Sequence, residues 1–292
     1  MLLGAVEAGG TKFVCAVGNE FGEVIKKVRI DTTNPEETLG KVFEFFKSYD
    51  VKAVGLGCFG PLDLNEASKT FGYITTTPKK AWRNYNILEA FKRELHIPVL
   101  LDTDVNASCI GEATYGSGKG IKNCLYLTVG TGIGGGALVN GELLHGLLHP
   151  EMGHILVRKH KEDSYEGKCP WHHSCLEGLA SGPALKERLG GKGAEELEED
   201  SPLWDYVAYY LAQALMNYVL ILSPEIIILG GGVMHNEHLL KKTRESFKEL
   251  LAEYVIHRNF KEDIEKYIIS PALGDDAGIV GALALGKLAL EK

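Results

Sequence analysis

Two cysteines and three histidines gather in one short part of the chain. Cys169, His172, His173 and Cys175 lie within seven residues, and His154 lies upstream of them. Zinc takes sulfur and imidazole ligands in a tetrahedron, and a C-x2-H-x2-C turn with one outside histidine supplies four ligands. The spacing favours Cys169, His172 and Cys175 with His154, and leaves His173 as the alternative to His172. We therefore predict a structural zinc site.

Disulfide bonds and ordinary free thiols are the alternative interpretations of the six cysteines. The chain begins MLLGAVEAGGTK, without the basic segment, apolar run and cleavage site of a secretory signal, so we expect a cytoplasmic protein. There, a cysteine pair beside histidines is more typical of a metal site than of a disulfide. The remaining cysteines stand alone in apolar runs and are expected to be small buried hydrophobes: Cys15, Cys58, Cys109 and Cys124.

Two carboxylates, Glu151 and Glu177, bracket the cysteine–histidine cluster. A bound metal would pin this segment to its scaffold, and ionised carboxylates accept hydrogen bonds from hydroxyl groups. We therefore expect this stretch to hold a polyol.

Three glycine-rich segments follow apolar runs. In the first, Gly9 and Gly10 precede Thr11 and Lys12, and such a turn lets backbone N–H groups and polar side chains approach phosphate oxygens. The second, residues 130–136, holds more glycine than a turn requires and could clamp a triphosphate from the other side. The third, Gly230–Val233, suits a nucleotide base or ribose, and the first and third segments are also compatible with plain turns. None matches a Walker loop or a dinucleotide fingerprint.

The segment Asp102-Thr-Asp-Val-Asn106 lies between a predicted strand and a predicted helix. The carboxyl ends of strands in α/β sheets open into clefts. Asp104 there is suited to accept a proton from a sugar hydroxyl that attacks phosphorus, and Asn106 to hold a substrate hydroxyl. Two alternatives stay open, because Asp104 could instead cap the helix and Asp102 is equally well spaced for the base.

One α/β pattern occurs twice along the chain. The first occurrence has strands at 2–6, 13–17, 24–30, 51–56 and 99–101 and helices at 35–48, 87–95 and 105–115. The second has strands at 124–129, 135–139 and 226–229 and helices at 203–222 and 237–255. We expect two similar lobes, 1–118 and 119–274, a hinge near 116–120, and a helix over about 275–292 that packs back on the first lobe. A cleft between such lobes is a natural ligand site.

Composition excludes two classes of function. Among 292 residues, no apolar run approaches the roughly 20 that a membrane helix needs. The net charge of −8 argues against a nucleic-acid binder, which usually carries a basic face. We therefore expect small-molecule ligands and neither membrane nor nucleic-acid partners.

Taken together, these segments resemble the ROK family of sugar kinases (repressor, open reading frame, kinase) and its fructokinase branch. The motifs that carry the resemblance run in order over nearly the whole chain: Glu7-Ala-Gly-Gly-Thr-Lys12, Thr103-Asp-Val-Asn106, Gly130-Thr-Gly-Ile-Gly-Gly-Gly136, Glu151-Met-Gly-His154, Cys169–Cys175 with Leu-Glu-Gly178, Ser181-Gly-Pro183 and Gly230–Val233. The resemblance implies an α/β, actin-like ATPase (ribonuclease H-like) fold of two lobes with an interlobe cleft. It also implies ATP with Mg²⁺, a hexose acceptor and a homodimer.

Residue by residue, the resemblance assigns Asp104 as the catalytic base and His154, Cys169, His172 and Cys175 as zinc ligands. Sugar contacts fall on Glu151, His154 and Glu177. Nucleotide contacts fall on Thr131, Gly132, Pro183, Gly230, Gly231, Gly232, Val233 and Met234. Glu7 stands where most of the family carries Asp, which alters how it would orient a water on Mg²⁺. Thr103 replaces the common Asn before the base, so a substrate hydrogen bond would differ.

The fructokinase branch predicts transfer of the γ-phosphoryl group of ATP to the 6-hydroxyl of D-fructose. Another hexose, such as glucose, mannose or an N-acetylhexosamine, is the alternative acceptor, because a few hydroxyl contacts decide the sugar. A sugar-responsive regulator is less favoured, since such relatives carry a DNA-binding helix-turn-helix ahead of the first phosphate loop, which here begins at residue 7.

Overall fold

Two five-stranded sheets with the same connectivity form the framework in the computed structural model, which describes residues 1–198 and 201–291. The first has the order β3-β2-β1-β4-β7 and the second the order β10-β9-β8-β11-β12. Strands of the first sheet are β1 (Leu2–Ala8), β2 (Lys12–Asn19), β3 (Val24–Asp31), β4 (Val54–Cys58) and β7 (Val99–Thr103). Strands of the second are β8 (Cys124–Val129), β9 (Ile133–Val139), β10 (Glu142–Leu143), β11 (Ile226–Gly230) and β12 (Ile268–Ile269). The predicted α/β fold with two similar lobes is confirmed.

Each sheet contains one of the predicted glycine hairpins. Strands β1 and β2 are antiparallel, with Ala8 opposite Phe13, and β8 and β9 are antiparallel, with Val129 opposite Ile133. Each first strand also pairs in parallel with a later strand, β1 with β4 and β8 with β11. Both hairpin tips therefore lie at the same edge of their sheet as the carboxyl ends of the parallel strands, where ligand sites of α/β sheets occur.

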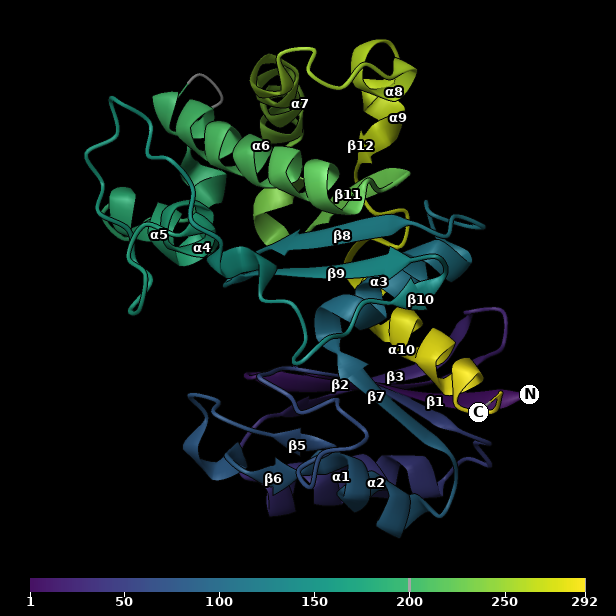
Figure 1. Cartoon of the computed structure of the whole chain (residues 1–292). Coiled ribbons are helices and arrows are strands. Elements are labelled where there is room, and N and C mark those ends of the chain that lie inside the picture. The colour runs from purple at the N-terminus through teal and green to yellow at the C-terminus, as the bar shows by residue number, and fades with distance from the viewer. Residues whose placement is uncertain (199–200, 292) are drawn as a thin grey trace.

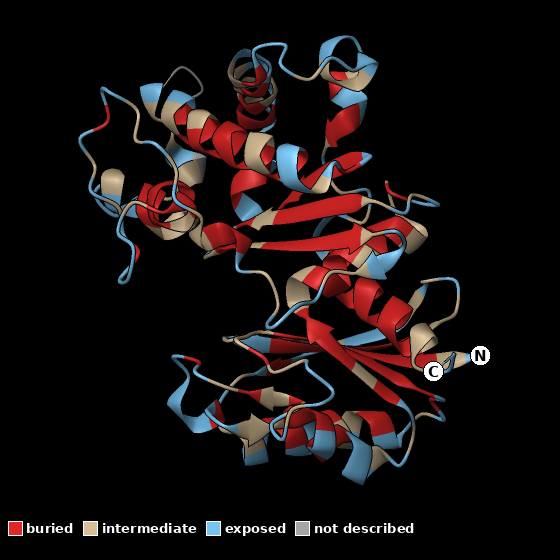
Figure 2. Cartoon of the chain, in the orientation of Figure 1, coloured by how far each residue is buried: buried red, intermediate tan, exposed pale blue. Residues whose placement is uncertain are grey.

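The helices form three layers around the two sheets (Figure 1). Helices α1 (Pro35–Lys47) and α2 (Ile87–Leu95) cover the outer face of the first sheet, and α6 (Pro202–Leu222) and α7 (Glu237–Leu251) cover the second. Helices α3 (Asp104–Tyr115) and α10 (Ala277–Leu288) lie between the sheets and are largely buried (Figure 2). No helix within residues 1–198 and 201–291 has the length and apolar character needed to cross a membrane.

The remaining elements are short. They are β5 (Tyr73–Ile74), β6 (Tyr85–Asn86), α4 (Leu176–Ala180), α5 (Gly182–Arg188), α8 (Arg258–Lys261), α9 (Ile264–Tyr267) and five 3₁₀ turns, η1 (Lys80–Trp82), η2 (Met152–His154), η3 (Ala194–Glu196), η4 (Gly232–His235) and η5 (Gly274–Asp276). Some predicted bounds were wrong. Helix α7 ends at Leu251 rather than near residue 255, with Ala252 in the left-handed conformation as its cap, and the strand predicted from residue 51 begins at Val54.

Helix α10 packs on β1 and β4 of the first sheet although it follows the second sheet in the chain. It crosses α3 closely, because a Cβ on Gly281 would lie 1.7 Å from the carbonyl oxygen of Ala107 and a Cβ on Gly111 would lie 2.7 Å from Gly281 Cα. Only glycine allows that approach. The predicted lobe limits at residues 118 and 274 stay predictions, and Lys292, the end of the predicted span 275–292, lies outside the described residues.

A buried carboxylate joins the two places where the chain passes from one sheet to the other. The side chain of Glu112, at the end of α3, accepts hydrogen bonds from Ser117 N at 2.8 Å and from Leu273 N at 2.8 Å. Ala272 N donates to the same carboxylate at 3.2 Å. Residues 116–120, predicted as a hinge, are thus tied to the return connection at 270–273.

Candidate active site

Asp104 begins α3 directly after β7. The N-cap of that helix is Thr103, whose hydroxyl accepts from Asn106 N at 3.1 Å, so the alternative role of Asp104 as the cap is not observed. Burial, with the nearby charge of Glu151, raises the pKa of Asp104 to about 6, against a hydrogen bond from Val105 N that lowers it. A carboxylate with a pKa near physiological pH is suited to general base catalysis.

Asp102 is buried, and its carboxylate is fully engaged. Its Oδ1 accepts from Thr103 N at 2.8 Å and from Asn106 Nδ2 at 2.8 Å, and its Oδ2 lies 2.8 Å from His145 Nε2. These partners leave little capacity for a substrate proton. Of the two aspartates that the sequence left open, the geometry therefore favours Asp104 as the base and gives Asp102 a positioning role.

Glu7 ends β1 close to Asp104. Burial, and then the charge of Asp104, raises the pKa of Glu7 to about 7, while Lys12 acts in the opposite direction. The start of α10 makes room for this side chain, because a Cβ on Gly278 would lie 2.8 Å from Glu7 Cδ. A cavity of about 340 Å³ adjoins the group and is lined by Glu7, Lys12, Val14, Lys27, Arg29, Asp275 and Asp276. Lys27 and Arg29, on β3, were missed in the sequence because no motif marks them.

The tip of the first hairpin is a tight turn. Gly9 N donates to Lys12 O at 3.0 Å, and a Cβ on Gly9 would lie 2.8 Å from that same oxygen. Thr32 N donates to Thr11 O at 3.0 Å, which braces the tip from β3. The predicted phosphate contacts Gly9, Gly10, Thr11 and Lys12 therefore share one turn beside Glu7.

Three segments of the second lobe converge at the corresponding edge of its sheet. Gly182 N, at the start of α5, donates to Gly130 O at 2.8 Å, and the predicted nucleotide contacts Thr131 and Pro183 adjoin this bond. A Cβ on Gly130 would lie 4.0 Å from Gly232 N, and one on Gly232 would meet nothing within 4 Å. These segments carry the sequence-predicted set Thr131, Gly132, Pro183, Gly230, Gly231, Gly232, Val233 and Met234, of which Val233 and Met234 are buried.

Part of the glycine content of residues 130–136 has a different cause from the one predicted. Gly134, Gly135 and Gly136 belong to β9 rather than to the hairpin tip. A Cβ on Gly136 would lie 2.4 Å from Val105 O, and one on Gly135 would lie 2.5 Å from Met152 Sδ. Gly134 and Gly136 let the start of α3 approach the second sheet and Gly135 makes room for Met152 of η2, so these glycines serve packing rather than a triphosphate.

Four side chains form the predicted sugar-binding wall: Asn106, Glu151, His154 and Glu177. Glu177, in α4, accepts from Ile133 N at 3.0 Å, which fixes it against the second hairpin. Its other oxygen lies 3.9 Å from His154 Nε2, which is too far for a hydrogen bond, so the two atoms do not bond each other and could each bond a hydroxyl. The charge of Glu151 acts on Asp104, and Glu151 Oε1 lies 3.7 Å from His149 Nδ1.

His154, Cys169, His172 and Cys175 bring one ligand atom each within 4.8 Å of one another. Cys169 Sγ lies 3.8 Å from His154 Nδ1 and 3.7 Å from His172 Nδ1, and Cys175 Sγ lies 3.6 Å from His154 Nδ1. A tetrahedral zinc would hold sulfur and nitrogen ligands about 3.6 Å apart, so the group fits the ion. His173 is outside the group, has a φ of 49°, and pairs its backbone with Cys169.

The loop that carries these ligands has a second anchor that sequence reasoning missed. Arg188, in α5, donates to both oxygens of buried Asp163 at 2.9 and 2.8 Å, and Tyr210 of α6 donates to Asp163 at 2.6 Å. Such a bidentate pair fixes geometry as well as charge. Its partners lie far apart in sequence, so no local pattern indicated it.

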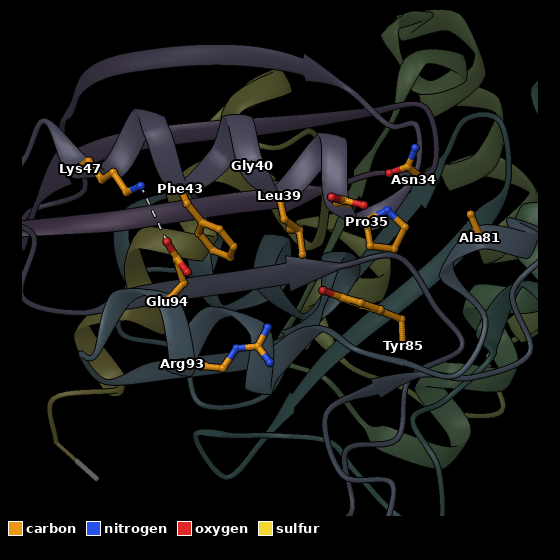
Figure 3. Close-up of a pocket in the computed structure, with 11 residues that line it drawn as sticks. Asn34, Pro35, Leu39, Gly40, Phe43, Lys47, Ala81, Tyr85, Arg93 and Glu94 are labelled. Atoms are coloured by element: carbon orange, nitrogen blue, oxygen red, sulfur yellow. Dashed lines mark ion pairs between the residues drawn. The ribbon is translucent and has the colours of Figure 1, made fainter.

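A separate cavity of about 670 Å³ lies on the outer side of the first lobe, between α1 and residues 81–94 (Figure 3). Leu39, Phe43 and Tyr85 form its apolar part, and Lys47 Nζ lies 3.8 Å from Glu94 Oε1 across it. It contains none of the sequence-predicted site residues. The volume of this cavity is therefore no reason to assign it as the catalytic site.

Comparison with known proteins agrees with this arrangement. The model of the family described as ROK family matches residues 3–288. A fructokinase from Lactococcus lactis subsp. cremoris is 46% identical over 288 residues, covering 98% of this chain and 96% of the relative. A fructokinase from Streptococcus mutans serotype c is 43% identical over 296 residues, covering 100% and 97%. A ROK family glucokinase from Streptomyces griseus, solved with glucose and AMPPNP, is 26% identical with a TM-score of 0.78, covering 99% and 100%.

Proposed function

The chain belongs to the ROK family, and on that premise we propose that it is an ATP-dependent fructokinase, which transfers the γ-phosphoryl group of ATP to the 6-hydroxyl of D-fructose. The choice of fructose rests on one observation. Relatives that are 46% and 43% identical over nearly their full length are named fructokinases. The site supports the reaction class, because the half-buried Asp104 lies near Glu7 beside the first glycine turn and near Glu151 of the carboxylate wall.

ATP is proposed to bind at the open backbone formed by residues 130–132, 182–183 and 230–234, with its phosphates directed toward the tip at Gly9–Lys12. Lys12 and the backbone N–H groups of these turns would supply the donors that phosphate oxygens need, apart from those, such as Gly9, Gly130 and Gly182, that already donate to backbone carbonyls. Mg²⁺ supplies charge neutralisation to the phosphates in phosphoryl transfer. Glu7 and Asp104, two neighbouring carboxylates with raised pKa values, fit a cation nearby. The presence of Mg²⁺ stays a prediction.

Fructose is proposed to lie against Asn106, Glu151, His154 and Glu177. Asp104 accepts the proton of the 6-hydroxyl while that oxygen forms its bond to the γ-phosphorus, and the bond from phosphorus to the bridging oxygen of ADP breaks. The protein contributes positioning and charge stabilisation, as is general for phosphoryl transfer. Lys12 is a cation close to the predicted transfer path, since its charge already acts on Glu7.

Zinc is proposed to be structural. It would be held by His154, Cys169, His172 and Cys175, and the ion would supply a fixed tetrahedral link between η2 and the loop before α4. His154 would then face the metal through Nδ1 and the sugar through Nε2. Location in the cytoplasm and a homodimer stay predictions. None of the six cysteines is in a disulfide.

A panel of sugars tests the proposed function. Purified protein with Mg-ATP would be assayed for ADP release with fructose, glucose, mannose and N-acetylmannosamine, and the phosphorylated carbon identified by NMR. We expect the highest kcat/KM with fructose and the phosphate on carbon 6. Turnover of glucose or mannose at least as efficient as that of fructose would instead support a ROK kinase for another hexose.

A further inference from the structure

The loop at residues 144–150 belongs to the second lobe but contacts the first lobe at two points. His145 Nε2 lies 2.8 Å from Asp102 Oδ2 at the end of β7. His149 Nε2 accepts a hydrogen bond from Leu62 N at 3.0 Å. Between them, Leu147 is 87% exposed at the tip of the loop. The loop therefore bridges the lobes through its two histidines, next to the proposed sugar site.

The contact with Asp102 defines which atoms donate. A carboxylate only accepts hydrogen bonds, so His145 carries its proton on Nε2 and Asn106 points its Nδ2 amide group at Asp102. The 3.5 Å between Asn106 Nδ2 and His145 Nε2 then separates two donors and is no hydrogen bond. Because its amide nitrogen is committed to Asp102, only the Oδ1 of Asn106 is left for a hydroxyl, and since Asn106 is 1% exposed a sugar would reach that oxygen only through a narrow opening.

We propose that His145 is a positioning residue for the sugar. By holding Asp102 from across the cleft, it fixes the amide of Asn106 so that Oδ1 is presented to a fructose hydroxyl. Asp102 is 4% exposed, so without His145 one of its buried oxygens would lose a hydrogen-bond donor and the carboxylate would reorient. The contact also makes the orientation of Asn106 depend on loop 144–150 lying against the first lobe. This inference rests on the proposed sugar-kinase function.

The test compares His145→Ala, His145→Gln and the loop-tip control Leu147→Ala. We expect His145→Ala to raise the KM for fructose about tenfold, with kcat within threefold and the KM for ATP unchanged, because a lost positioning contact weakens sugar binding. His145→Gln keeps a side-chain N–H donor and should recover the KM to within about threefold. Leu147→Ala should match the wild type in all three constants.

Two results would overturn the proposal. One is a KM for fructose in His145→Ala within twofold of the wild type. The other is an equal loss in His145→Ala and His145→Gln that also changes the KM for ATP, since that pattern indicates a purely structural role. Wild-type protein that phosphorylates another hexose instead of fructose would count against the proposed sugar only, and the same comparison would then be made with that hexose.

Discussion

At the scale of single residues, two neighbouring carboxylates define the cleft. Glu7 lies near the end of β1 and Asp104 begins α3. Burial raises the pKa of both; the charge of Asp104 raises that of Glu7 further, and the charge of Glu151 raises that of Asp104. With pKa values of about 7 and about 6, Glu7 and Asp104 both lose their protons near neutral pH. A perturbed pair of this kind is typical of a functional site.

Glu7→Gln should stabilise the protein free of nucleotide and metal at pH 8 but much less at pH 5. The folded-state pKa of about 7 exceeds the ordinary value of 4.5, so folded Glu7 resists ionisation and its contribution to stability falls as pH rises from 4.5 through 7. At pH 8 we expect a gain on the order of 1–3 kcal/mol in the free energy of unfolding from urea titrations.

Glu249→Gln, an exposed change on α7, is the matched control for charge removal and should have little effect at either pH. An equal gain for Glu7→Gln at pH 5 and pH 8 would show that burial of the charge is not the cause.

The sequence identified Asp104 because a strand followed by a helix start is a local pattern. It could not separate Asp104 from Asp102, since the difference comes from His145, 43 residues away along the chain. The same limit applies to Lys27 and Arg29, which join the cavity beside Glu7 only through the pairing of β2 with β3.

At the scale of elements, the segment between η2 and α4 depends on side chains for its shape. No helix or strand is assigned between Ile155 and Cys175. The cysteine–histidine group holds one end of this segment, and the Asp163–Arg188 pair holds its middle. Glu177 follows immediately in α4, so the position of a sugar contact depends on this loop.

Removal of zinc should lower both stability and sugar affinity. We expect metal analysis of purified protein to find about one zinc per chain, and a strong chelator, or Cys175→Ser, to lower the melting temperature and weaken fructose binding in calorimetry. His154 links the two effects, because Nδ1 faces the cluster and Nε2 faces Glu177.

Cys109→Ala, which alters a buried cysteine remote from the cluster, should keep its zinc. Purified wild-type protein without zinc, or chelation that leaves fructose affinity intact, would count against this role.

The hairpins and most helices were predictable because turn glycines and apolar periodicity are local signals. The packing role of Gly134–Gly136 was not predictable, because the residues that approach them come from other parts of the chain. The end of α7 was likewise not predictable, because its left-handed cap is Ala252 rather than the glycine that is usual at this position.

At the scale of the whole molecule, the proposed active site combines residues from both lobes. Asp104 and the Gly9–Lys12 turn come from the first lobe, and the open glycine backbone and the sugar wall come mainly from the second. The repeated α/β pattern predicted two lobes. The burial of α3 and α10 between the sheets, and the link that Glu112 makes between both connections, depend on contacts distant in sequence.

The most direct test of this account is fructose phosphorylation by Asp104→Asn. The variant is isosteric, and its Oδ1 can still accept the hydrogen bond from Val105 N, so the fold should be kept. We expect kcat to fall about 10²–10⁴-fold with fructose affinity within a few-fold of the wild type. Wild-type kcat/KM should fall below about pH 6, because the base must be deprotonated to act. Turnover by Asp104→Asn near the wild-type rate would contradict the account.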